Sequence, residues 1–215
     1  MPEISVIEFG VAGGNGLLVL EMEAAAVEKA TGVSIKVYGF DNGSAGLPEF
    51  IGDYRDHPDA WVAGDYPMDE ASLRSKLSQR TTLIIGNVKD TVPRFVDDPR
   101  NAPVGFISID VDLYSSTRDA LKILSLPNKR MLTRVPIYFD DIGRYINHRM
   151  AGELLAIEVF NRENENVFID KWMGIKEGRP FPEKSYLDMM YVAHDLEAIS
   201  RVRLNRDPVE LPLAR

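Results

Sequence analysis

The sequence contains no cysteine, so neither a disulfide framework nor a thiolate metal site is possible. It has no apolar run long enough to cross a bilayer, and its first residues lack the basic and apolar regions of a signal peptide. Positive charge is also scarce, because 25 Lys and Arg stand against 33 Asp and Glu, for a formal net charge of -8. Attraction to a phosphate backbone depends on clustered Lys and Arg. We therefore expect a cytoplasmic protein with no nucleic acid or membrane partner.

The sequence does contain enough apolar material for one substantial core. At 215 residues and 45% hydrophobic content, the chain can fill one domain, whereas two well-sized domains would need more residues. No internal repeat, low-complexity segment or shift of composition marks a boundary. We expect a single domain over residues 1–215.

Short apolar segments alternate with helical segments along most of the chain. Five segments are predicted as strands: Ile4 to Phe9, Ile35 to Phe40, Leu83 to Ile85, Val104 to Ile109 and Val135 to Phe139. Helices are predicted over Leu17 to Ala30, Glu70 to Leu77, Ser116 to Leu124 and Ala151 to Asn161. Strands that are apolar on both faces and alternate with helices indicate a parallel sheet covered on both sides.

Two later segments are predicted to extend this sheet. Val167 to Ile175 and Tyr186 to His194 favour extended structure and are expected to form an antiparallel pair. The predicted fold class is therefore α/β, a doubly wound parallel sheet with a C-terminal antiparallel pair.

In an open α/β sheet, ligands bind beyond the carboxyl ends of the strands, so the residues that follow each strand are the most informative. The first strand ends in a glycine-rich loop, Gly10 to Gly16, which lets the backbone approach a ligand and point amides toward it. Asp41 lies 31 positions beyond Gly10, at the end of the neighbouring strand, where a carboxylate can bind ribose hydroxyls. Loop and acid together indicate an adenosine-type nucleotide, although a tight turn without a ligand would use the same glycines.

Two adenosine-containing ligands suit the loop, NAD(P) and S-adenosylmethionine. The spacing of Gly10, Gly14 and Gly16 is similar to the loop of short-chain dehydrogenases, which bind NAD(P). No tyrosine in the chain is followed four residues later by lysine, however, so the proton-transfer pair of those dehydrogenases is missing. S-adenosylmethionine is the favoured ligand, and an NAD(P)-dependent oxidoreductase is a weaker alternative.

Four aspartates follow the fourth and fifth predicted strands: Asp110, Asp112, Asp140 and Asp141. Neighbouring strands lie about 4.8 Å apart, so these exits would bring several carboxylates into one small volume. Like charges raise one another's pKa, and a hard divalent cation with oxygen ligands keeps them ionised. Magnesium is the expected cation, ahead of calcium or manganese. Any single one of these acids would also suit a helix cap.

Four motifs occur in order between Glu8 and about Phe160. They are Glu8-Phe9-Gly10-Val11, then Gly39-Phe40-Asp41 with Gly46-Leu47-Pro48, then Gly86 to Pro93, and finally Ile109-Asp110-Val111-Asp112-Leu113-Tyr114-Ser115-Ser116-Thr117 completed by Phe139-Asp140-Asp141. In this order they resemble the class I methyltransferases that O-methylate sugars and phenols of antibiotics, the macrocin, mycinamicin and novobiocin O-methyltransferases. The last motif is the most specific.

The resemblance implies a Rossmann-like methyltransferase fold and a role for each acid. Asp110, Asp140 and Asp141 match magnesium ligands, and Asp112 matches the general base. Residues implied to bind the cofactor S-adenosylmethionine are Glu8, Gly10, Ala12, Gly13, Asp41, Asn42, Asn87 and Asp110. The acceptor would be a small molecule with a hydroxyl, of sugar or phenol type.

The chain departs from this family on the acceptor side. The first strand begins almost at Met1, so we expect the amino-terminal segment that covers the acceptor pocket in the relatives to be missing, and a homodimer if a second subunit supplies it. Residues able to frame an acceptor are Tyr145 to Met150 and the aromatic side chains Trp61, Tyr66, Trp172 and Tyr186. A noncatalytic nucleotide-binding or scaffold protein of the same fold is the other alternative, but a scaffold has no use for a crowded anionic cleft.

Overall fold

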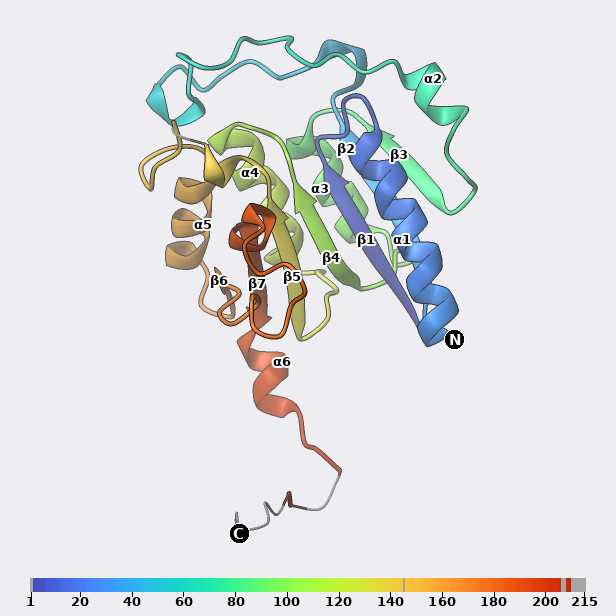
Figure 1. The fold of residues 1–215 in the computed structure, drawn as a ribbon. Coiled ribbons are helices and arrows are strands. Elements are labelled where there is room, and N and C mark those ends of the chain that lie inside the picture. The colour runs from blue at the N-terminus through green and yellow to red at the C-terminus, as the bar shows by residue number, and fades with distance from the viewer. Residues whose placement is uncertain (1, 145, 206–207, 210–215) are drawn as a thin grey trace.

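Seven strands form one sheet in the computed structural model, which describes residues 2–144, 146–205 and 208–209. They are β1 (Glu3–Phe9), β2 (Ser34–Asp41), β3 (Thr81–Ile85), β4 (Val104–Ile109), β5 (Arg134–Phe139), β6 (Val167–Lys171) and β7 (Met190–Asp195). Their order across the sheet is β3-β2-β1-β4-β5-β7-β6 (Figure 1). Strand β7 runs antiparallel to β5 and β6, and the other pairings are parallel. The predicted α/β class and the antiparallel pair are confirmed.

The helices cover both faces of this sheet. They are α1 (Asn15–Thr31), α2 (Glu70–Arg74), α3 (Val88–Asp97), α4 (Tyr114–Leu121), α5 (Gly152–Glu163) and α6 (Leu196–Arg201). Val6 of β1 packs in a cluster with Leu17 and Ala24 of α1, whereas Ile7 packs in the larger cluster with α3, α4 and α5. Strands buried on both faces therefore read as apolar runs, which is why the sequence revealed them.

Two helices were not predicted. Pro93 lies inside α3, and proline in a helix interior removes a backbone hydrogen bond, which weakens the helical pattern of this segment. Burial of Val92, Phe95 and Val96 offsets that cost. The short helix α6 has no buried residue, so it lacks the periodic apolar face on which the predictions relied.

The predicted bounds were wrong at the C-terminal pair. β6 ends at Lys171, four residues before the predicted end, and a 3₁₀ helix at Ser185–Met189 occupies the start of the second predicted strand. Within the described ranges, no helix combines the length and apolar composition required to cross a bilayer. The carboxyl ends of β1, β2, β4 and β5 lie at one edge of the sheet, and the long connection from β2 to α2 arches over that edge (Figure 1).

Candidate active site at the carboxyl ends of the strands

A cleft of about 240 Å³ opens at the carboxyl edge of the sheet. The structure brings most of the predicted site residues together there: Gly10, Ala12, Asp41, Asn42, Asn87, Asp110, Asp112 and Asp140 line it. Glu8, Gly13 and Asp141 are not among its lining residues. The residues come from the exits of β1, β2, β3, β4 and β5, so the cleft exists only because the sheet places these exits side by side.

Asp41 holds the glycine loop in place. Its Oδ2 accepts hydrogen bonds from the backbone N–H groups of Val11 (2.8 Å) and Ala12 (2.9 Å), and its Oδ1 accepts one from Gly43 (2.6 Å). Two loop amides therefore point at this carboxylate, whereas we expected the loop to present its amides to a ligand. Asp41 also lines the cleft, so its role toward a ribose stays a prediction.

Gly10 is required where β1 leaves the sheet. Its φ is +82°, and a Cβ at this position would lie 1.6 Å from the carbonyl oxygen of Asp110. The backbone of the first motif thus passes directly against the exit of β4, and only glycine permits that approach.

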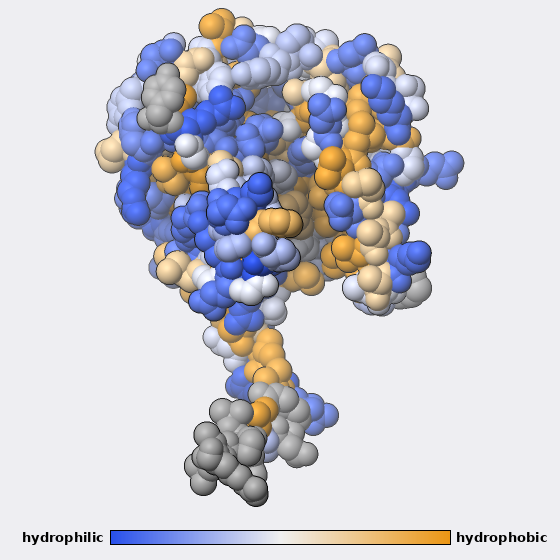
Figure 2. Space-filling view, viewed as in Figure 1, coloured by the Kyte–Doolittle hydropathy of each residue, from blue (hydrophilic) through white to orange (hydrophobic). Residues whose placement is uncertain are grey.

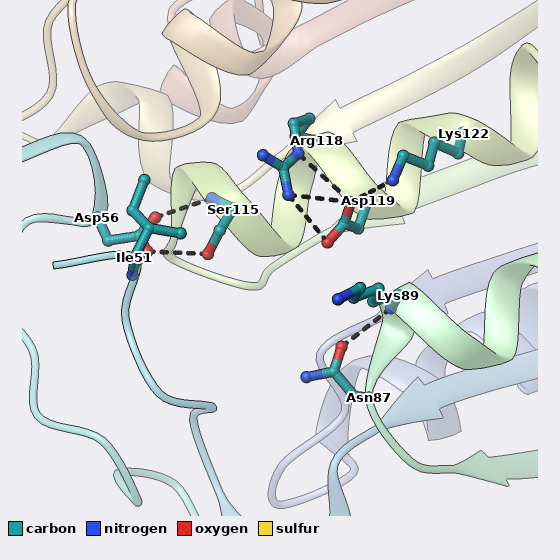
Figure 3. Close-up of polar contacts among 8 residues, drawn as sticks. All are labelled: Ile51, Asp56, Asn87, Lys89, Ser115, Arg118, Asp119 and Lys122. Carbon is teal, nitrogen blue, oxygen red and sulfur yellow. Dashed lines mark hydrogen bonds and ion pairs between the residues drawn. The ribbon is translucent and has the colours of Figure 1, made fainter. Parts of the chain in front are cut away.

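The two predicted asparagines line the cleft and shape its rim. Oδ1 of Asn87 accepts a hydrogen bond from the Lys89 N–H (3.0 Å) and caps α3 (Figure 3). Nδ2 of Asn42 donates to the carbonyl oxygen of Gly46 (2.8 Å). Each fixes a turn that follows a strand, and a cofactor contact for either stays a prediction.

Asp112 reaches the cleft because the chain leaves strand geometry at this residue. Its φ is +59°, and the Leu113 N–H donates to the carbonyl oxygen of Val111 (2.5 Å), so the chain turns sharply between β4 and α4. A left-handed conformation costs a non-glycine residue on the order of 1 kcal/mol, and such strain is typical of functional positions. The turn brings the Asp112 carboxylate into the cleft beside Asp110 and Asp140.

The carboxylates crowd one another as predicted. Burial, with the charges of Asp140 and Asp141, raises the pKa of Asp110 to about 7. Burial, with the charges of Asp141 and Asp110, raises the pKa of Asp112 to about 8. The pKa of Asp141 is also raised, chiefly by burial. Strands β4 and β5 are neighbours, and this pairing produces the crowding.

Two residues that contact this carboxylate cluster, Arg144 and Glu153, were not predicted from the sequence. Nε of Arg144 lies 2.7 Å from Oδ1 of Asp141 as an ion pair, and Arg144 lines the cleft. Glu153 is fully buried in the first turn of α5, where its Oε2 accepts a hydrogen bond from the Asp141 N–H (3.1 Å). Burial raises the pKa of Glu153 well above its usual range. Glutamate is common in a first helical turn at the surface, so nothing in the sequence placed this one inside.

The donor atoms of this cluster suit a hard divalent cation. Both carboxylate oxygens of Asp141 are buried, and neither makes a hydrogen bond within the described residues. In the described part of the chain, however, no three Asp, Glu, His or Cys side chains converge as metal ligands, and Arg144 is a cation that faces Asp141. Binding of magnesium by Asp110, Asp140 and Asp141 stays a prediction.

Glu8 lines a second cavity beside α1 and is not among the residues that line the cleft. This cavity of about 380 Å³ is lined by Glu8 together with apolar residues that include Val19, Leu20 and Phe106, and Figure 2 shows the surface hollowed next to α1. Oε2 of Glu8 is buried and has no hydrogen-bond partner within the described residues. Burial, then the charges of Asp110 and Asp41, raises the pKa of Glu8 to about 8. Glu8 therefore lies within the electrostatic influence of two residues that line the cleft, although it does not line the cleft itself.

The chain matches no protein-family model and no curated protein. Its structure is similar to that of the calicheamicin methyltransferase CalS11, with a TM-score of 0.61 and 20% identity over 88% of this chain and 71% of that chain. The chain has a methyltransferase fold. A second structure of CalS11, described as a TDP-rhamnose 3'-O-methyltransferase, aligns with a TM-score of 0.52 and 20% identity over 88% of this chain and 70% of that chain. The O-methyltransferase NovP aligns with a TM-score of 0.52 and 19% identity over 74% of this chain and 63% of that chain. The methyltransferase fold agrees with the resemblance in the four sequence motifs.

Proposed function

We propose that this protein is an S-adenosylmethionine-dependent O-methyltransferase that acts on a hydroxyl of a small molecule of sugar or phenol type. The observation that carries the proposal is the left-handed turn at Asp112, which places a carboxylate in the same cleft as Gly10 and Asp41. A base beside a nucleotide-type loop is the minimum that methyl transfer to oxygen requires. The methyltransferase fold supports it, as do the O-methyltransferase activities of CalS11 and NovP.

In the proposed reaction, the acceptor oxygen attacks the methyl carbon of S-adenosylmethionine as the carbon–sulfur bond breaks. The products are the methyl ether and S-adenosylhomocysteine, and the hydroxyl proton passes to the Asp112 carboxylate. No covalent intermediate is needed, so the protein contributes mainly by holding the two reactants in line and removing the proton. Gly10, Ala12, Asp41, Asn42 and Asn87 line the donor side of the cleft in this proposal.

Asp110, Asp140 and Asp141 are the residues proposed to hold magnesium. When bound, the ion would offset their crowded charge and lower the pKa of an acceptor hydroxyl. Tyr138 orients one of these ligands, because its hydroxyl donates to Oδ1 of Asp140 (2.8 Å). Asp141 is held through its backbone by Glu153.

Calorimetry with S-adenosylmethionine, S-adenosylhomocysteine and NAD tests the donor half of this proposal. Binding of both sulfur ligands and no binding of NAD is expected. Tight binding of NAD with no response to S-adenosylhomocysteine would instead favour the oxidoreductase alternative. Binding of S-adenosylhomocysteine with no methyl transfer to any acceptor would favour a noncatalytic protein.

Asp112→Asn tests the base. Catechol and methyl rhamnoside serve as phenol and sugar probes, and transfer is followed by release of S-adenosylhomocysteine. We expect the variant to lose at least a hundredfold in kcat, because an amide cannot accept the proton, while its affinity for S-adenosylhomocysteine stays within twofold. Unchanged turnover would remove Asp112 from the mechanism.

A further inference from the structure

The long connection between β2 and α2 forms a closed loop over the cleft, and we call its residues 47–66 the strap. Its two ends meet at a neck, where the Leu47 N–H donates to the carbonyl oxygen of Asp65 (2.8 Å) and the Gly64 N–H donates to that of Leu47 (2.8 Å). Gly46 enters the neck with φ +64°, and a Cβ there would lie 2.4 Å from the Asp65 carbonyl oxygen. Loops of this length in compact domains are usually functional.

Asp56 fastens the strap to α4. The side chain is fully buried, and its Oδ1 accepts a hydrogen bond from the backbone N–H of Ser115 (2.8 Å). Its Oδ2 accepts from the Ser115 hydroxyl (2.9 Å) and the Ile51 N–H (2.9 Å) (Figure 3). The adjacent Arg55 guanidinium lies 5.1 Å from the ring centroid of Tyr114. Because Ser115 is the second residue of α4 and lies three residues after Asp112, this carboxylate caps the helix that starts from the Asp112 turn.

A second anchor ties the strap to the exit of β5. Trp61 is 8% exposed, and the Arg144 guanidinium lies 5.2 Å from its ring centroid. Arg144 is also the ion-pair partner of Asp141. The strap therefore contacts both of the turns that carry the crowded carboxylates, one through Asp56 and one through Trp61.

The strap also supplies the outer wall of the cleft. Leu47, Pro48, Asp65 and Tyr66 line it. Tyr66 has φ +58° and stays half exposed, with its ring 6.0 Å from that of Trp61. A large aromatic residue held in a left-handed conformation at a cleft carries strain that the surrounding contacts must impose.

We propose that Asp56 is a positioning residue for methyl transfer, and that Tyr66 on the strap contacts the acceptor ring. Asp56 holds the strap, and therefore Tyr66, in place. It also holds the start of α4, which follows Asp112 in the chain. The acceptor is an uncharged or cationic hydroxylated ring, because the carboxylates of Asp65, Asp110, Asp112 and Asp140 line the same cleft. This inference rests on the proposed function. The strap also gives the chain a wall for the acceptor, so a second subunit is not needed to supply that wall. The homodimer stays a prediction.

The two tryptophans of the chain make the strap observable by fluorescence. Trp172→Phe leaves Trp61 as the single reporter. In this background we expect Asp56→Ala to shift the Trp61 emission to longer wavelength and to speed tryptic cleavage after Arg55 at least tenfold. Affinity for S-adenosylhomocysteine should stay within twofold, because Asp56 does not line the cleft.

Asp53→Ala is the matched control. Asp53 lies on the same turn, but its carboxylate bonds Arg55 within that turn and is partly exposed. We expect this variant to leave the Trp61 emission unchanged. If Asp56→Ala does not fold, Ser115→Ala removes only the hydroxyl bond and should give a smaller shift in the same direction.

Kinetics with catechol separate positioning from general stability. Asp56→Ala should raise the KM for catechol, lower kcat, and move the pH at which kcat is half-maximal, since the Asp112 turn loses its support. Emission and cleavage equal to the parent would overturn the inference. A parallel loss of S-adenosylhomocysteine affinity would also overturn it, because that result indicates a merely structural role. If the parent methylates no probe, the proposed function fails. Trp61 emission and tryptic cleavage still show whether Asp56 fixes the strap.

Discussion

Buried carboxylates dominate this protein at the scale of the residue. Asp56 and Glu8 are both almost inaccessible to solvent, but only Asp56 has hydrogen-bond donors on both carboxylate oxygens within the described residues. Asp56 accepts three hydrogen bonds, from the Ile51 N–H, the Ser115 N–H and the Ser115 hydroxyl. Oε2 of Glu8 accepts none within the described residues, and burial favours the protonated form. The stability of the fold should therefore depend on pH through Glu8.

Glu8→Gln tests this dependence. Folding raises the Glu8 pKa from 4.5 to about 8, so between these values the folded state binds more protons than the unfolded state. The free energy of unfolding should then fall as pH rises from 5 to 8, by up to about 1.4 kcal/mol per pH unit from this group. Urea denaturation across this range should show a flatter slope for Glu8→Gln. Glu23→Gln, an exposed residue of the same cavity, should keep the parent's slope.

Asp140→Asn tests the metal. We expect it to abolish magnesium-dependent transfer while the affinity for S-adenosylhomocysteine, measured by calorimetry without magnesium, stays within twofold. The physical reason is that an amide replaces a charged oxygen ligand but leaves the donor side of the cleft intact. Asp98→Asn, at a surface ion pair with Arg100, should behave like the parent. Equal activity of the parent with and without a chelator would contradict the magnesium prediction.

At the scale of the element, the turns that leave the strands decide what the cleft contains. β1 ends against the backbone of Asp110, which requires glycine at position 10. β4 ends in the left-handed turn at Asp112, and α4 begins two residues later under the cap provided by Asp56. A change in one of these turns should therefore affect ligand binding more than a comparable change elsewhere.

Gly10→Ala and Gly32→Ala make a matched pair for this prediction. Both glycines have positive φ, but a Cβ at Gly32 meets nothing within 4 Å, whereas one at Gly10 collides with the Asp110 carbonyl. We expect Gly32→Ala to cost about 1 kcal/mol of unfolding free energy and to leave ligand affinity unchanged. Gly10→Ala should cost at least about 2 kcal/mol and abolish S-adenosylhomocysteine binding. Equal effects of the two changes in urea denaturation and calorimetry would show that the close approach is unimportant.

At the scale of the whole molecule, the cleft joins both halves of the sheet. Its lining runs from the β3 exit at Asn87 to the β5 exit at Asp140, with β1 at the centre of these five neighbouring strands. A ligand seated across these exits binds only the folded state, so its binding energy adds to global stability.

A thermal unfolding series measures this linkage. S-adenosylhomocysteine at about 100 times its Kd should add about 2.7 kcal/mol, which raises the Tm of a chain of this size by about 5–10 °C. NAD at the same concentration should leave the Tm unchanged. A rise of Tm with NAD alone would support the oxidoreductase alternative.

The sequence by itself determined the architecture and most of the chemical groups in the cleft. The apolar strand β1 buries Val6 in the cluster on one face of the sheet and Ile7 in the cluster on the other, so its continuous apolar pattern can be recognised in the local sequence. Because ligands bind at the carboxyl ends of the strands, the positions of Asp41, Asp110 and Asp140 directly after strands indicated these residues from the sequence alone.

Only the tertiary structure decided which way these groups point and what surrounds them. Asp41 turns to the loop amides, Glu8 faces a separate cavity, and Asp112 enters the cleft through a positive φ. Asp56 and Ser115 are 59 residues apart, and no periodicity or spacing links them. Such contacts depend on packing between distant elements, and for this reason the strap and its anchors could not be predicted from the order of residues alone.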